Sequence, residues 1–379
     1  MKGKTFLILL VAAGVLAALW FFRLGDEKRT DALKMGEKLF ADLPVNAVAR
    51  VTIADADHQV TLVRGETVWQ VQERSGYPAD FDGLRDMVVK LSRLKIGRTF
   101  SGSPESLARL SLQAPATPGN SAAGRQVTLK DPSGKVLADI ILGQIREAED
   151  GGSGGQYLKK ADDDTVYLVD GSFRFLKTAP AQWLKKEILD IKADEVASVT
   201  CFADDLQTPV FALSRPEKGA PGRLTPAPSS GTADPAKIDQ VFDALGSLTL
   251  DDVRDAGGVS LPADAGRTRL VYRLYDGRQI SIFPDVDGQE NYTIRVAAAA
   301  WSEKAHTAVS PESTAGDGDQ PTAEEADADT AVPAEKTVQQ LNEDLGPWIF
   351  SVKKWQYDSF ITQAASLLKE EKKPDEGTS

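Results

Sequence analysis

The sequence predicts an α+β protein made of two tandem repeat units, each an antiparallel β-sheet packed on an amphipathic helix. A transmembrane helix is expected before the units, and a C-terminal β-strand/helix segment after them. The main observation is an internal repeat, because "NAVARVTI" at residues 46–53 returns as "DEVASVTC" at residues 194–201. Three landmarks recur in the same order, spaced by 148, 154 and 143 residues: the octets, a helical leucine (Leu91 and Leu245) and a hairpin glycine (Gly134 and Gly277).

The N-terminus carries the second observation. Residues 5–22 contain no charged side chain, and 18 residues of helix span about 27 Å, close to the thickness of a bilayer core. Lys2 and Lys4 precede this run, which ends in an aromatic trio typical of a membrane interface. No small-x-small cleavage site follows, so we expect an uncleaved signal anchor, with a cleaved signal peptide as the alternative.

Each octet is followed by the same kinds of element. Residues 58–73 alternate apolar and polar side chains around Gly65, and residues 208–228 predict a second pair of short strands with a longer turn. Residues 77–96 and 234–250 then place their apolar side chains on one helical face. A further hairpin follows each helix, and it turns at Gly134 and at Gly277.

These elements divide the chain into eight parts. The expected boundaries are 1–4 (cytoplasmic head), 5–22 (transmembrane signal anchor), 23–43 (juxtamembrane linker), 44–180 (first unit), 181–301 (second unit with its connector), 302–337 (disordered acidic insertion), 338–370 (C-terminal strand and helix) and 371–379 (disordered tail).

The charge of the chain is concentrated in one segment. The formal net charge is −12, and residues 306–335 hold eight acidic side chains and no Lys or Arg. This composition, poor in large apolar residues, predicts disorder. The rest of the chain shows no basic footprint for nucleic acid, so we expect no nucleic-acid partner.

The C-terminal segment is different in kind. Residues 348–352 alternate apolar side chains as a strand would, and an apolar run suited to a helix spans residues 360–368. Return to a core is the favoured interpretation, and a partner-binding helix is the alternative. Aromatic side chains after a disordered insertion also suit a contact surface, and the candidates are Trp348, Trp355, Tyr357 and Phe360.

Catalytic, cofactor and metal sites find no support in the sequence. "GGSGG" at residues 151–155 matches the nucleophile-elbow pattern, but acidic residues precede it and a strand follows it. Acidic clusters at residues 55–57, 162–164 and 285–287 fall in predicted turns, where Asp is favoured for local hydrogen bonds. Cys201 aligns with Ile53 and is expected to be a buried, inert thiol. We therefore predict a non-enzymatic protein without cofactor or metal.

Several of these segments together resemble the bacterial domain-of-unknown-function 4340 family. They are the anchor, "VARVTI", the Trp69 strand with "YPADFDGLRDMVVKLSRLK", "DTVYLVDGSF", the Trp183 connector and "LNEDLGPWIFSVKKW". The resemblance implies a single-pass protein of the bacterial cytoplasmic membrane, with its bulk in the periplasm or otherwise outside the cytoplasm. Such proteins are often encoded beside ABC transporters of the gliding-motility type.

The function expected from the residues and the resemblance together is an accessory or scaffold role. Its partners would be the membrane and membrane-complex proteins such as ABC transporter subunits. The alternative is an extracytoplasmic module that binds a sugar, peptide or envelope polymer in the cleft between the two units.

Overall fold

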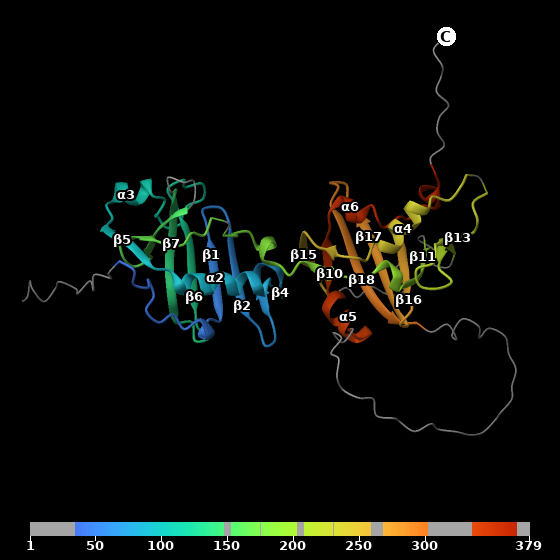
Figure 1. The fold of residues 1–379 in the computed structure, drawn as a ribbon, viewed down its shortest axis with the longest axis horizontal. Helices are drawn as coiled ribbons and strands as arrows, with labels where there is room; N and C mark the ends of the chain where they lie inside the picture. Colours follow the sequence, from blue (N-terminus) through green and yellow to red (C-terminus); the bar gives the residue numbers. More distant parts are fainter. Residues whose placement is uncertain are drawn as a thin grey trace, which may run out of the picture. The chain divides into compact units, whose positions relative to one another are not determined.

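The computed structural model describes most of the chain as two sheets with a few short helices (Figure 1). The described residues are 35–147, 153–174, 176–202, 208–229, 231–258, 268–301 and 336–369. The expected anchor at residues 5–22 lies outside them, as do the head, the tail and nearly all of the acidic insertion. No helix in the described ranges is long and apolar enough to cross a membrane.

Contacts along the backbone divide the chain into two compact units. The first unit comprises Met1–Gln70 and Phe81–Trp183, and the second comprises Val71–Asp80 and Leu184–Ser379. A short piece of the N-terminal half is therefore counted with the second unit, which no feature of the sequence indicated.

A nine-stranded sheet has the order β4-β3-β2-β1-β6-β7-β8-β9-β5. Its strands are β1 (Arg50–Ala54), β2 (Gln59–Arg64), β3 (Trp69–Val71), β4 (Tyr77–Pro78), β5 (Ile96–Ser101), β6 (Arg125–Lys130), β7 (Val136–Glu147), β8 (Ser153–Lys160) and β9 (Thr165–Val169). Helix α2 (Phe81–Arg93) leads into β5, and α3 (Pro104–Arg109) follows it. Turns of 3₁₀ helix lie at Val45–Ala47, Gln72–Arg74 and Pro180–Trp183.

The second large sheet has eight strands in the order β13-β12-β11-β16-β17-β18-β19-β15, and β10 pairs with β14 separately. The strands are β10 (Glu187–Leu189), β11 (Val196–Phe202), β12 (Pro209–Ser214), β13 (Arg223–Thr225), β14 (Leu248–Thr249), β15 (Asp252–Asp255), β16 (Arg269–Leu274), β17 (Arg278–Val286), β18 (Tyr292–Ala300) and β19 (Trp348–Ser351). Helices are α4 (Pro235–Asp243), α5 (Val338–Leu345) and α6 (Lys354–Tyr357), with 3₁₀ turns at Ala193–Glu195 and Ala364–Leu367.

The two sheets share one strand order. With β4 set aside, the first sheet has the order β3-β2-β1-β6-β7-β8-β9-β5. Each of these eight strands corresponds to the strand at the same place in the second sheet, which begins with β13 and ends with β15. We call β1 to β9 the first repeat and β11 to β19 the second repeat. The antiparallel α+β fold expected from the sequence is confirmed.

The two octets become central strands of their sheets. Ile53 on β1 lies opposite Val60 and Val127, and Cys201 on β11 lies opposite Phe211 and Leu270. Both side chains are fully buried. The hairpin glycines Gly134 and Gly277 both adopt positive φ, which glycine tolerates without steric cost. The octets and the hairpin glycines therefore have equivalent structural roles. The third landmark is only partly equivalent, because Leu91 lies in α2 whereas Leu245, equally buried, lies in the turn after α4, which ends at Asp243.

The C-terminal segment supplies a strand of the second repeat. β19 lies between β18 and β15, in the place that β9 takes between β8 and β5. Return to a core, the favoured interpretation, is confirmed, because Phe350 and Leu367 are fully buried.

The helix expected over residues 360–368 is not formed, and that expectation was wrong. Only a 3₁₀ turn, Ala364–Leu367, is present there. The reason lies in the repeat, because residues 362–371 ("TQAASLLKEE") correspond to residues 178–187 ("TAPAQWLKKE"). In each segment a leucine, Leu184 or Leu368, pairs with a residue just before a helix, α2 or α4. Isolated bridges join Ala79 to Leu184 and Ala233 to Leu368. The next amides donate equivalent bonds, Lys185 N to Pro78 O and Lys369 N to Thr232 O, both 2.9 Å.

Candidate functional site

An exposed group of aromatic side chains lies on the second unit. Trp355 on α6 has 63% of its surface exposed, the largest exposure of any described aromatic residue. Tyr357 packs its ring against Tyr292 of β18 at 5.0 Å between centroids, and Lys354 Nζ lies 5.4 Å from the Tyr292 centroid. Val286, exposed on β17, lies opposite Tyr292. We call Val286, Tyr292, Trp355 and Tyr357 the aromatic surface.

This surface is held by local bonds. Lys354 Nζ bonds both carboxylate oxygens of Asp358, at 2.8 and 2.9 Å, one turn along. The amide of Val352 donates to the carbonyl of Tyr292 at 3.0 Å, which ties the start of α6 to β18. Burial of Tyr357 and the nearby carboxylate of Asp285 raise the pKa of its phenol, so the ring stays neutral at ordinary pH. The four side chains of the aromatic surface are therefore uncharged, and the charged groups of Lys354, Asp358 and Asp285 lie beside them.

The other two candidate contact residues lie elsewhere. Trp348 on β19 is half-buried, and its ring forms a T-shaped pair with that of Tyr77, with 5.1 Å between the ring centroids. Phe360 is only 3% exposed, so its side chain packs inside the second unit. Of the four sequence candidates, Trp355 and Tyr357 are the two that the structure places together on a surface.

Arg74 and Tyr77 dock on the β15–β19 edge within the second unit. Arg74 forms a bidentate ion pair with Asp252 of β15, with Nε–Oδ1 at 2.6 Å and Nη2–Oδ2 at 2.8 Å. Burial raises the pKa of the Asp252 carboxyl, but the bonds from Arg74 and from the Val253 amide outweigh it, and the pKa falls below its usual value. Sequence patterns gave no signal for this pair, because the two residues are 178 positions apart.

Cys201 has the role of a core residue. Its Sγ donates a weak hydrogen bond to the Thr362 carbonyl at 3.6 Å. Burial raises the pKa of the thiol to about 12, so almost none is thiolate at neutral pH.

The acidic clusters make hydrogen bonds within turns. The Asp55 carboxylate accepts from the amides of Asp57 and His58, at 2.9 and 2.7 Å. The Asp287 carboxylate accepts from the amides of Gln289 and Asn291 in the same way. In the described parts of the chain, no group of three or more His, Cys, Asp or Glu side chains could hold a metal ion.

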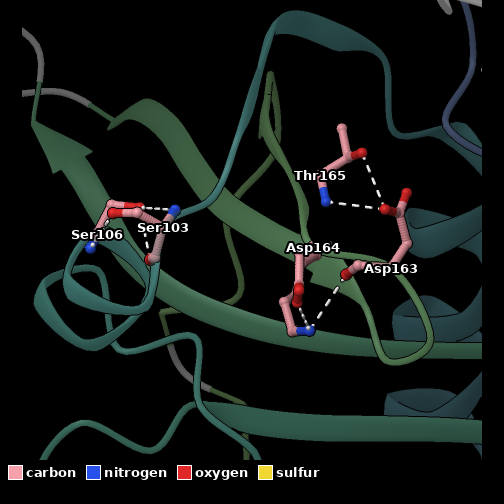
Figure 2. A network of polar contacts seen from close by, with 6 residues as sticks. Ser103, Ser106, Asp163, Asp164 and Thr165 are labelled. Carbon is pink, nitrogen blue, oxygen red and sulfur yellow. Dashed lines mark hydrogen bonds and ion pairs between the residues drawn. The ribbon is translucent and has the colours of Figure 1, made fainter.

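The β8–β9 turn holds a network of polar contacts (Figure 2). Asp163 Oδ1 accepts from the amide and hydroxyl of Thr165, both at 3.0 Å. Buried Lys159 donates to the carbonyl of Asp163 and the carboxylate of Asp164. Beside this turn, Ser103 and Ser106 cap α3 reciprocally. Each polar group stabilises a local turn, so this network is structural.

A pocket in the first unit was not anticipated from the sequence. It has a volume of about 360 Å³ and lies between α2 and the segment after β9. Its lining includes three basic side chains, those of Lys90, Arg174 and Lys177, and no acidic side chain. The apolar lining consists of Met87, Phe173, Leu176 and Trp183. The alternation of apolar and basic residues in "SFRFLK" (172–177) is the signal that sequence analysis missed.

One comparison with known proteins gives a match. A family of proteins that share a domain of unknown function, DUF4340, matches residues 69–268, which is more than half of the chain. No curated protein matches the chain, and no solved structure does. The matched segment contains α2, the pocket and the strands from β3 to β15. The chain therefore belongs to the DUF4340 family.

Proposed function

We propose that this protein is a non-enzymatic, membrane-anchored accessory or scaffold protein whose folded part lies outside the cytoplasm. It would be held in the cytoplasmic membrane by residues 5–22 and would bind a subunit of a membrane complex of the ABC-transporter type. The observation that carries the contact role is the exposure of Trp355 within the aromatic surface.

The chemistry of this surface suits a protein partner. Trp and Tyr dominate binding energy at protein interfaces because they bury large areas and lose little conformational entropy. Asp358 and Tyr292 hold Lys354 beside the rings, so a charged group already borders the apolar patch. A partner that covers Trp355 would gain roughly 2 kcal/mol or more from this one side chain.

Photo-crosslinking in native membranes tests the proposal. The full chain would carry p-benzoylphenylalanine at position 355 or, as the matched control, at Val136, an exposed apolar residue of the first unit. We expect an adduct with an ABC transporter subunit from position 355 and none from position 136. If membranes containing the transporter give no such adduct at position 355, the contact role is refuted.

The anchor has its own test. Carbonate washing of membranes should leave the full chain in the pellet and release a chain that lacks residues 1–22. Protease added outside spheroplasts should digest the folded part. Release of the full chain by carbonate, or complete protection from protease, would contradict the proposed anchoring and orientation.

A further inference from the structure

We propose that the pocket of the first unit binds a small water-soluble organic anion with a carboxylate or phosphate head and an apolar body. This inference concerns a different unit from the aromatic surface and does not depend on the accessory role. It rests on the charge of the pocket lining, its apolar side chains and the replacement of its three basic residues at the corresponding positions of the second repeat.

The charge of the pocket is opposite to that of the chain. Three basic groups line it, in a protein with a formal net charge of −12. A neighbouring hollow that shares Lys90 is lined by two basic side chains, Lys90 and Arg93, and by two acidic ones, Asp86 and Asp170. The lining of the pocket is therefore more basic than that of this neighbour, which favours an anionic ligand.

Aromatic rings hold two of the cations in place. Lys90 Nζ lies 5.0 Å from the Phe173 centroid and donates to the Ser172 carbonyl. Lys177 Nζ lies 5.5 Å from the Trp183 centroid, and Trp183 Nε1 donates to the Lys177 carbonyl at 3.0 Å. Arg174 Nη2 lies 3.8 Å from the carboxylate of Glu147, and both side chains are exposed, so water screens this pair and a ligand can compete with it. An ammonium carries three donors, and a guanidinium can bind carboxylate or phosphate in a bidentate way.

The apolar lining gives the second half of the ligand chemistry. Met87, Phe173 and Trp183 are buried within the first unit, yet each contributes surface to the pocket. A volume of about 360 Å³ is at the lower end of the range for small-molecule sites. A ligand with an aromatic ring system or a short acyl chain would fit this size, with its charged head among the basic groups.

The second repeat shows that the fold does not need these cations. Equivalent bridges align Ala79 with Ala233 and Leu184 with Leu368. The same spacings align Lys90 with Ala244, Arg174 with Asp358 and Lys177 with Ile361. Three basic positions in one repeat thus correspond to one acidic and two apolar positions in the other, which points to binding and away from a packing role.

Calorimetric titration of the full chain in neutral-detergent micelles tests the inference. The probes are 1-naphthyl phosphate and 2-naphthoate, with uncharged 2-naphthalenemethanol and inorganic phosphate as comparisons. The pocket variant is Lys90→Ala with Arg174→Ala, both exposed positions. The matched control is Lys135→Ala with Arg109→Ala, which removes the same charges from exposed positions of the first unit outside the pocket lining.

We expect at least one naphthyl anion to bind, and the pocket variant to weaken its binding at least about tenfold. The control variant should bind as the parent chain does, and a preference between the two anions identifies the head group. Three results would overturn the inference: neither anion binds, both double variants weaken binding equally, or one comparison probe binds as tightly as the anions.

Discussion

Replacement of Phe350 tests whether β19 is an integral strand of the second unit. Phe350 is fully buried, lies opposite Val253 and Ile294, and places its ring 6.3 Å from that of Tyr77. Phe350→Ala removes a ring from a closed core, which costs about 3 to 5 kcal/mol. For a unit of this size, such a loss lowers the melting temperature by roughly 6 to 20 °C.

The assay is thermal unfolding followed by near-ultraviolet circular dichroism, with urea unfolding as a second measurement. The matched control is Ile349→Ala, since this neighbour on the same strand is only half-buried. We expect the control to cost about 1 kcal/mol. If Phe350→Ala costs no more than Ile349→Ala, β19 does not contribute to the core and the segment is an attached peptide.

Four further outcomes are expected. Arg74→Ala should cost about 1 kcal/mol, because the pair with Asp252 is partly exposed. The pKa of Asp252 is lowered in the folded state, so the pair stabilises the fold fully above its unfolded pKa, about 3.9. This stability is lost as the pH falls further, and Asp252→Asn should flatten the acid limb of urea unfolding. Cys201 should react with a thiol reagent at pH 8 only after unfolding, because its thiol is buried and almost fully protonated. Asn342→Ala should cost about 1 to 2 kcal/mol and speed amide exchange at Ala298, since the Asn342 amide exchanges two 2.8 Å bonds with that residue.

Controls for these variants come from exposed residues with similar chemistry. Arg85 pairs with Asp82 on the surface of α2, and Gln339 bonds Glu343 on α5. Arg85→Ala and Gln339→Ala should each change stability by less than about 0.5 kcal/mol. Equal effects in test and control variants, or rapid labelling of Cys201 in the folded protein, would contradict the roles assigned above.

Much of the fold could be predicted because the duplication is visible in short sequence patterns. The octets, the helical faces and the hairpin glycines each depend on side chains close together in sequence. The strands, helices and turns that they predict are present, although α4 ends at Asp243 and residues 248–249 form a strand. The C-terminal strand was expected, but its equivalence to β9 was missed. The match between "TQAASLLKEE" and "TAPAQWLKKE" was the available signal.

The candidate site was less accessible to sequence analysis. Trp355 and Tyr357 could be chosen as aromatic residues beside lysines, but their neighbour Tyr292 is more than 60 positions away. The pocket requires α2 and the segment after β9 to meet, although they are about 80 residues apart. Arg74 and Asp252 meet only because residues 71–80 join the second unit. Such long-range pairs leave no periodic pattern in the chain.

The position of β19 between β18 and β15 has a consequence for biosynthesis. β15 is synthesised nearly 100 residues before its partner β19, so β15 stays unpaired until β19 has been made. An unpaired strand edge is a template for aggregation, and late pairing is slow. A chain that stops before residue 348 would leave β15 without its partner strand and would leave β18, which still pairs with β17, with one open edge. Completion of the second sheet thus depends on full-length synthesis, which makes prematurely ended chains recognisable to chaperones and proteases.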